Sequence, residues 1–190
     1  MAETATHPPE GELKSVTSRL DALEKRQQRC PDANALSVVV FSGDLDKLLA
    51  AFVIATGAAA CGMRVSMFFT FWGTAALKKT GPQSRGKTLV ERMFGWMLPG
   101  GFHKRKLSKM DMGGIGRLLM AREMKRKGTP DLPSLIEIAR ETDIDICVCE
   151  MSMSLMGIRK DELIDYPDME FCGVASFVET ASKAGTTLFI

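Results

Sequence analysis

Short apolar runs rich in β-branched residues alternate along the chain with longer segments in which apolar residues recur every three or four positions. The first pattern predicts buried β-strands and the second predicts helices. Strands are expected at residues 36–41, 64–71, 144–149, 170–173 and 186–190. The main helices are expected at residues 12–29, 45–60, 90–98, 116–127, 131–141 and 174–183. This alternation predicts an α/β fold in three layers, with a mainly parallel sheet flanked by helices.

The chain divides into three parts of different composition. Residues 1–11 are polar and proline-rich, which predicts a disordered tail. Residues 12–35 are expected to form an N-terminal helix and a linker, and residues 36–190 are expected to form the α/β domain. Within the domain, residues 73–130 are long for a connection between two elements, which indicates a lid-like insertion with a function of its own. The many lysines and arginines of this insertion form either a solvated face or a surface for an acidic partner.

The N-terminal helix has a narrow apolar seam. Leu13, Val16, Leu20 and Leu23 recur at steps of three and four residues, as in a coiled coil. Two heptads are too short to be stable alone. We therefore expect this helix to pack on a second copy of the chain or on its own domain, and to assist the formation of a homo-oligomer.

Composition and charge narrow the possible function classes. A net charge of +2 over 190 residues gives no bulk attraction to nucleic acid, so no nucleic-acid partner is expected. The five cysteines are scattered and no signal-peptide pattern precedes them, which predicts a cytoplasmic protein with reduced thiols. The apolar stretch 48–77 is broken at Gly57, Gly62 and Arg64 into pieces of about 14 residues, shorter than the roughly 20 that span a bilayer. Membrane contact is therefore not expected.

Cys149 stands at the end of a predicted strand, where small polar residues indicate the start of a short helix. In open α/β folds, ligands gather at the carboxyl ends of the strands. Unpaired backbone N–H groups at the start of a helix stabilise a thiolate, and the Ser152 hydroxyl can cap the helix and reach the sulfur. We therefore predict that Cys149 is a reactive thiol. The alternative is that Cys147 and Cys149 are small core residues, as free cysteines often are.

The segment Gly81–Thr88 matches the P-loop pattern G-x-x-x-x-G-K-[ST]. Such a loop requires a buried strand that leads directly into it, so that its backbone N–H groups can hold phosphates. Here residues 73–80 separate the strand from the loop, and no strand ends in an aspartate that could hold magnesium, unless Glu150 substitutes for it. We therefore expect that Lys87→Ala leaves stability unchanged and that nucleotides bind weakly.

No metal site is predicted. Cys147 and Cys149 could offer two thiolates, but a structural zinc ion takes four ligands and the other cysteines lack a matching spacing. The two histidines are His7, in the predicted tail, and His103, in the insertion. A catalytic cysteine–histidine pair would have to use His103, and this alternative stays open.

Several stretches of the domain are similar to a known family. They are Phe41–Lys47, Phe68–Gly73, Ser108–Gly113, Cys149–Ile158, Cys172–Ala175 and Leu188–Ile190. Together they resemble the DsrE/DsrF-like family, and most closely its DsrE-type sulfur-transfer branch, also described as peroxiredoxin-like. The likeness extends over residues 36–190, and its most specific part is the stretch that follows Cys149.

The resemblance implies a small DsrE/F-like α/β domain, generally oligomeric. Its relatives carry sulfane sulfur on a cysteine and exchange it with rhodanese-like and TusA-like proteins. The family's cysteine corresponds to Cys149, and its chemistry is the attack of a thiolate on a persulfide sulfur, which requires no cofactor. Ser152 and the turn formed by Ser42, Gly43 and Asp44 are the candidate binding or thiolate-stabilising residues.

We therefore predict a sulfur carrier or sulfurtransferase that uses Cys149. The chain departs from the family pattern at Cys172, where a second glycine is expected. The Cys147/Cys149 pair is another departure, and it permits a redox side reaction. A non-catalytic oligomerisation or ligand-binding module with a structural cysteine is the alternative from another class, and a P-loop nucleotide enzyme is the third reading. The pattern does not identify the sulfur donor, the acceptor or the size of the oligomer.

Overall fold

A parallel β-sheet forms the centre of the computed structural model, which describes residues 10–27, 30–98, 100–101 and 105–190. Within these residues the sheet has five strands in the order β4-β3-β2-β1-β5, and every neighbouring pair is parallel. The strands are β1 (Asp32–Val40), β2 (Arg64–Phe69), β3 (Asp145–Cys149), β4 (Glu170–Cys172) and β5 (Ala184–Phe189).

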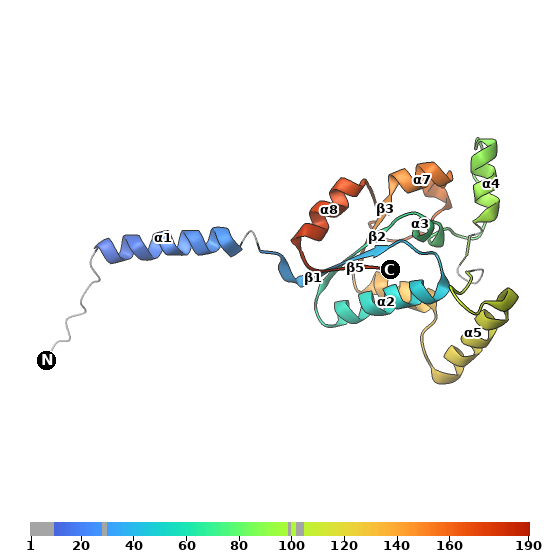
Figure 1. The fold of residues 1–190 in the computed structure, drawn as a ribbon, viewed down its shortest axis with the longest axis horizontal. Coiled ribbons are helices and arrows are strands. Elements are labelled where there is room, and N and C mark those ends of the chain that lie inside the picture. The colour runs from blue at the N-terminus through green and yellow to red at the C-terminus, as the bar shows by residue number, and fades with distance from the viewer. Residues whose placement is uncertain (1–9, 28–29, 99, 102–104) are drawn as a thin grey trace.

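Helices cover both faces of the sheet (Figure 1). Helices α2 (Leu45–Ala60) and α6 (Leu132–Glu141) pack together on one face, and α7 (Glu150–Met156) and α8 (Val174–Lys183) lie on the other. This arrangement confirms the predicted three-layer α/β fold. The other helical elements are α1 (Glu10–Gln27), α3 (Trp72–Ala76), α4 (Leu89–Met97), η2 (Met112–Gly114), α5 (Ile115–Lys127) and η3 (Lys160–Glu162).

The two faces of the sheet are buried to different extents. Successive residues of a strand point to opposite faces. The face toward α2 and α6 contributes six side chains that are at most 1% exposed: Val38, Val40, Met67, Phe69, Ile146 and Val148. The face toward α8 has a small cluster of buried residues, Val39, Phe68, Cys147 and Cys149. The two cysteines of β3 therefore lie on the more thinly covered face.

The first strand begins four residues earlier than predicted. Strand β1 begins at Asp32, inside the segment predicted as a linker, because Asp32 pairs with Ala184 of β5 across an irregularity in the register. The Arg64 side chain forms an ion pair with Asp32, and the Asn34 side chain donates a hydrogen bond of 2.8 Å to the Gly62 carbonyl. These contacts extend the strand beyond its apolar run. Residues 1–9 of the predicted tail lie outside the described residues, and the helix α1 already begins at residue 10.

The apolar stretch 48–77 is divided among α2, β2 and α3, as its glycines and its single arginine predicted. Its apolar side chains enter the core, among them Leu48, Phe52 and Met67. Within the described part of the chain, no helix is both long enough and apolar enough to cross a bilayer.

The predicted insertion, residues 73–130, is attached to the domain through several of its cations. The side chain of Lys78 donates to the Leu98 carbonyl at 2.9 Å, and the buried Arg105 donates to the Ala75 carbonyl. Burial lowers the pKa of Lys78, and it lowers the pKa of Arg105 to about 10. These two cations hold loops together and do not form a solvated face. The role of the segment as a lid stays a prediction.

The segment that resembles a P-loop surrounds a carboxylate of the chain itself. The Lys87 ammonium lies 2.6 Å from Glu162 Oε1, and the backbone N–H of Ser84 donates to the same oxygen at 2.7 Å. Strand β2 ends at Phe69, well before the segment begins, so no strand leads into it. Thr88 caps α4 through a capping box. Because the Lys87 side chain is only 1% exposed, the expectation that Lys87→Ala leaves stability unchanged is replaced by the opposite one.

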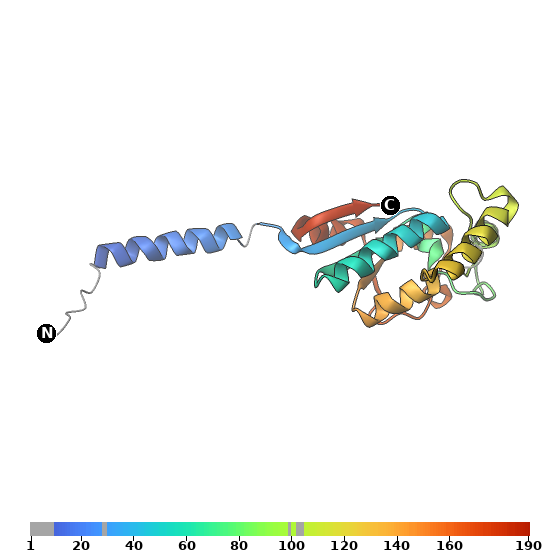
Figure 2. The same ribbon diagram turned by 90° about the horizontal axis from the view of Figure 1, so that it is seen from below.

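Helix α1 extends away from the α/β domain (Figures 1 and 2), and three apolar residues of its seam are exposed. Val16, Leu20 and Leu23 have exposed fractions of 51%, 51% and 60%. We expect them to pack on a second copy, so Leu20→Lys and removal of residues 1–30 should both reduce the sedimentation coefficient of the assembly. The matched control is Ser18→Lys, on the same helix but off the seam. An unchanged association state in both altered proteins would contradict this prediction.

Candidate functional site

Cys149 occupies the carboxyl end of β3, as predicted, but it is covered. It is the last residue of the strand, and α7 begins at the next residue. Its side chain is 0% exposed and packs in the cluster on the α8 face. The aromatic ring of Phe177 on α8 packs against this cluster and stacks on Phe68, with 4.5 Å between the ring centroids. The position therefore suits a reactive thiol that is shielded from solvent.

The hydroxyl of Ser152, in the first turn of α7, connects β3 to the end of β2. Ser152 Oγ lies 3.0 Å from Thr70 Oγ1 and accepts a hydrogen bond of 2.9 Å from the backbone N–H of Phe71. Because Phe71 already donates to Ser152, the hydroxyl hydrogen of Ser152 is left to point elsewhere. Ser152 and Thr70 both lower the pKa of the Cys149 thiol. Because the two hydroxyls share one hydrogen bond with each other, one hydroxyl hydrogen remains for the sulfur. Two hydroxyl groups therefore meet at the Cys149 thiol.

Hydrogen bonds determine the acidity of Cys149. Burial is the largest single influence and raises the pKa of the thiol. Hydrogen bonds from the side chain and the backbone of Ser152 act in the opposite direction. Further hydrogen bonds from Thr70 and from the backbone of Met151 lower the pKa as well. Together they outweigh burial and hold the pKa of Cys149 below its ordinary value, so the thiolate is populated at lower pH than in a free cysteine.

An unusual backbone turn after β2 positions Thr70 and Phe71. Phe71 has a φ of 44°, in a region that residues with a side chain rarely occupy. Gly73 follows it, and a Cβ atom at this position would collide with the Val40 carbonyl oxygen of β1. The Gly73 N–H donates to the Phe41 carbonyl at 2.9 Å. The chain thus turns sharply against β1 and directs the Phe71 N–H toward Ser152.

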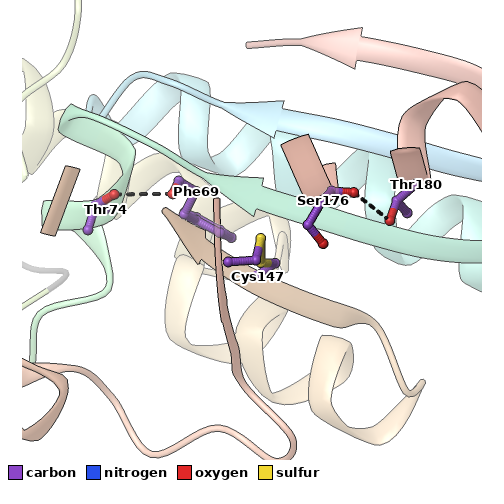
Figure 3. Close-up of a disulfide and its surroundings, with 6 residues drawn as sticks. Phe69, Thr74, Cys147, Ser176 and Thr180 are labelled. Atoms are coloured by element: carbon purple, nitrogen blue, oxygen red, sulfur yellow. Dashed lines mark hydrogen bonds between the residues drawn. A yellow bond between two sulfur atoms is a disulfide. The ribbon is translucent and has the colours of Figure 1, made fainter. Parts of the chain in front are cut away.

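A disulfide joins Cys147 of β3 to Cys172 of the edge strand β4, with 6.3 Å between the Cα atoms. The expectation of reduced thiols is therefore wrong for these two residues. The sequence could not show that β4 lies beside β3 and places Cys172 on the same face. Figure 3 views this disulfide between Phe69 and Thr74 on one side and Ser176 and Thr180 of α8 on the other. Cys149 stays free, and the strand register places it opposite Cys172.

Comparison with known proteins settles the family. A sequence profile described as the DsrE/DsrF/DrsH-like family matches residues 32–189. The chain belongs to this family. This finding confirms the resemblance that was noted from the sequence.

Individual relatives of this DsrE/DsrF/DrsH-like chain match over most of their length. An uncharacterized protein of Bacillus subtilis strain 168, YrkE, is 42% identical over 154 residues, which is 81% of this chain and 95% of YrkE. The sulfur carrier protein DsrE2 of Allochromatium vinosum is 32% identical over 161 residues, 82% of this chain and 97% of the relative. Among solved structures, the ychN protein from E. coli aligns with a TM-score of 0.47 and 9% identity, covering 82% of this chain and 97% of ychN.

The structure of this DsrE-like chain brings together some of the predicted site residues and not others. Ser152 contacts Cys149, as predicted. The turn Ser42–Asp44 follows β1, which is separated from β3 by β2. Its polar groups bind one another, with the Ser42 hydroxyl donating to Asp44 Oδ2 at 3.0 Å. No contact between this turn and Cys149 is found among the described residues, so its grouping with the thiol is not supported.

Thr70 is the site residue that sequence reasoning missed. The sequence contained a clue to Thr70, which is a hydroxyl residue near the carboxyl end of the predicted strand 64–71. The carboxyl ends of neighbouring parallel strands lie side by side, so such a residue can reach a site at the end of the next strand. Gly43 has a packing role instead, since a Cβ atom there would lie 2.7 Å from the Trp72 carbonyl oxygen. His103 lies outside the described residues, so its suggested pairing with Cys149 is not tested.

Metal ligation has little support in the part of the chain that the structure describes. No group of three or more His, Cys, Asp or Glu side chains there is arranged to hold an ion. Of the two cysteines considered as metal ligands, Cys147 forms the disulfide with Cys172 and therefore offers no thiolate. The polar groups around Cys149 are hydroxyls and backbone N–H groups, which stabilise an anion.

Proposed function

We propose that this protein is a sulfur carrier that holds sulfane sulfur as a persulfide on Cys149 and passes it to partner proteins. Membership of the DsrE/DsrF/DrsH-like family and the 32% identity with a protein named as a sulfur carrier support a role in sulfur transfer. The observation that carries the finer proposal is the position of the free Cys149 at the carboxyl end of β3, beside the hydroxyls of Ser152 and Thr70, which lower its pKa.

The chemistry follows from the thiolate and its donors. The Cys149 thiolate attacks the outer sulfur of a donor persulfide, R–S–SH, and forms Cys149–S–SH while R–S⁻ leaves as the thiolate. In the reverse direction, an acceptor thiolate attacks the outer sulfur and Cys149 is regenerated. The hydroxyls of Ser152 and Thr70 that stabilise the thiolate also stabilise a persulfide anion. Neither step needs a bound cofactor, because no electrons leave the sulfur atoms.

Access to the buried sulfur requires a local movement, and α8 is the element that we propose moves. None of its side chains is buried, and its aromatic contact with the sheet is the stack of Phe177 on Phe68. Elements with few buried contacts open at low free energy. Movement of α8 would uncover Cys149 without unfolding the larger core on the opposite face.

The partners and the location are part of this proposal. We propose TusA-like and rhodanese-like proteins as sulfur donors and acceptors, in the cytoplasm, with the chain assembled as a homo-oligomer. Exposed apolar side chains lie on the two segments that follow β2 and β3, and they give a partner protein a surface to contact. Trp72 follows the turn after β2 and is 47% exposed, and Met151 and Leu155 of α7 are 54% and 60% exposed.

The test is intact mass after treatment with a low-molecular-weight persulfide that is free of sulfide. It is best done with Cys30 and Cys61, the two exposed free cysteines, replaced by serine, so that Cys149 is the remaining free thiol. This background protein should gain the mass of one sulfur atom, and the same protein with Cys149→Ser should gain none. If replacing Cys147 abolishes the gain in mass and replacing Cys149 does not, the assignment of the persulfide to Cys149 is contradicted. If no protein gains sulfur from any donor, the binding-module alternative replaces the proposal.

A further inference from the structure

Three of the five cysteines lie together on one face of the sheet. Cys147 and Cys149 are two residues apart on β3, so their side chains point to the same face. Cys172 of β4 pairs with Cys149 in the strand register and forms the disulfide with Cys147. Neighbouring strands are about 4.8 Å apart, so a sulfur atom on Cys172 is within one side-chain movement of Cys149. A free thiol of lowered pKa therefore lies beside a disulfide.

We infer that the Cys147–Cys172 disulfide is a built-in two-electron oxidant that converts hydrogen sulfide into the sulfane sulfur held by Cys149. This inference rests on the proposed persulfide function of Cys149 and adds a substrate and a second activity to it. A carrier without such a disulfide must receive sulfur that is already oxidised. This arrangement would allow the chain to produce its own sulfane sulfur from fully reduced sulfide.

A small pocket gives access to the disulfide from outside. Its volume is about 160 Å³, and both disulfide cysteines line it together with Ser176, Phe177 and Thr180 of α8. Cys172 is half-buried on the edge strand, whereas Cys147 is 9% exposed. A molecule of a few atoms can therefore reach the sulfur of Cys172 through this pocket. The small volume of the pocket favours a small nucleophile.

The charge of the pocket favours entry of neutral H₂S. The carboxylates of Asp145 and Glu170 line the pocket and repel anions such as HS⁻. Burial raises the pKa of Asp145, and the nearby Glu170 raises it further. A carboxylate with a raised pKa is a better base than an ordinary one. Asp145 is therefore placed to accept a proton from H₂S inside the pocket, where the resulting HS⁻ meets the disulfide.

The steps balance in atoms and electrons. H₂S gives a proton to Asp145, and HS⁻ attacks the sulfur of Cys172, so that the S–S bond breaks, Cys172–S–SH forms and Cys147 leaves as a thiolate. The Cys149 thiolate then attacks the outer sulfur of Cys172–S–SH, forming Cys149–S–SH and releasing the Cys172 thiolate. The sulfide sulfur loses two electrons, and the disulfide gains them as two thiolates, which take protons from Asp145 and water. One chain makes one persulfide until its disulfide is reformed.

The proposed cytoplasmic location agrees with a disulfide of this kind. Disulfides of cytoplasmic proteins in mesophiles, where they occur, are usually transient and catalytic or redox-sensing. The final position of the sulfur is fixed by the hydrogen bonds at Cys149, since those donors stabilise a persulfide anion.

In the experiment, sodium sulfide is added to the oxidised protein that lacks Cys30 and Cys61. The sulfide is freed of polysulfide and the sample is kept anaerobic. Peptide mapping should find one sulfur atom on Cys149 and two new thiols, at Cys147 and Cys172. With Cys149→Ser the sulfur should stop on Cys172, and with Cys172→Ser no sulfur should be gained from sulfide. Parallel samples of the parent protein and of Cys172→Ser receive a persulfide donor. Loading of Cys149 in these samples shows that the fold and the carrier function are intact.

The outcomes separate the two proposals. If the persulfide donor loads Cys149 while sulfide leaves the disulfide closed, the inference is overturned and the carrier function stands. If sulfide opens the disulfide but the sulfur stays on Cys172 with Cys149 present, the transfer between them is refuted. If Cys172→Ser gains as much sulfur from sulfide as the parent protein, the disulfide is not the oxidant, and the inference fails.

Discussion

Glu162→Gln should lower the free energy of unfolding by about 3–5 kcal/mol, because it leaves the Lys87 ammonium buried without its counter-charge. The two side chains are 6% and 1% exposed, so water cannot replace the lost carboxylate. Burial raises the pKa of Glu162, but hydrogen bonds from Lys87 and from the Ser84 backbone outweigh it and lower the pKa overall. We expect the same direction of change for Lys87→Ala.

Chemical denaturation followed by circular dichroism measures this effect, with Glu123→Gln as the matched control. Glu123 pairs with Arg126 on the surface of α5, and such exposed pairs contribute less than about 1 kcal/mol. Because the folded pKa of Glu162 is depressed, its contribution is present above the unfolded pKa of about 4.3 and is lost as the pH falls through the lower folded value. The deficit of Glu162→Gln should therefore shrink in acid. Equal stabilities for the two variants at pH 7 would refute this account.

Ser152→Ala should reduce the rate of alkylation of Cys149 at neutral pH about ten-fold or more, since a hydrogen bond to a charged group is worth roughly 1.5–3 kcal/mol. The substitution removes the side-chain donor that lowers the pKa of Cys149 and leaves the burial that raises it. The pKa must therefore rise, and less thiolate is present at a given pH. The change also leaves the backbone N–H of Phe71 without its acceptor.

The measurement is the rate of reaction with iodoacetamide across pH, in the protein that lacks Cys30 and Cys61. The inflection should move to higher pH in Ser152→Ala, and Thr70→Val should move it in the same direction by less. Ser154→Ala is the control, because this serine lies on the exposed side of the same helix. A pH profile for Ser152→Ala that superimposes on that of the parent would show that the hydroxyl does not tune the thiol.

The sequence predicted the features that depend on residues close together along the chain. The β-branched runs gave the strands, and the step from Cys149 to Ser152 gave one thiol–hydroxyl contact. What it missed depends on strand order and on distant pairs. Thr70 reaches Cys149 because β2 lies beside β3, and Cys172 reaches Cys147 because β4 lies on the other side of β3. The turn at Ser42 was grouped with the thiol although β2 lies between them.

The Lys87–Glu162 pair illustrates the same limit. Its residues are 75 positions apart, and the local pattern around Lys87 matched a phosphate-binding loop. Only the fold shows that a carboxylate of the chain occupies the place of a bound anion. A pattern of residue types specifies the donors of such a loop, and the tertiary structure decides which anion they bind.

The disulfide also anchors the segment that covers the thiol. Strand β4 has only three residues and lies at the edge of the sheet, and α8 begins two positions after Cys172. While Cys147 and Cys172 are joined, the start of α8 is fixed covalently to β3. Once they are reduced, that attachment depends on the short edge strand and on the aromatic stack of Phe177. Oxidised chains would therefore keep Cys149 covered, and reduced chains would uncover it, which under the proposed carrier function is the state that delivers sulfur.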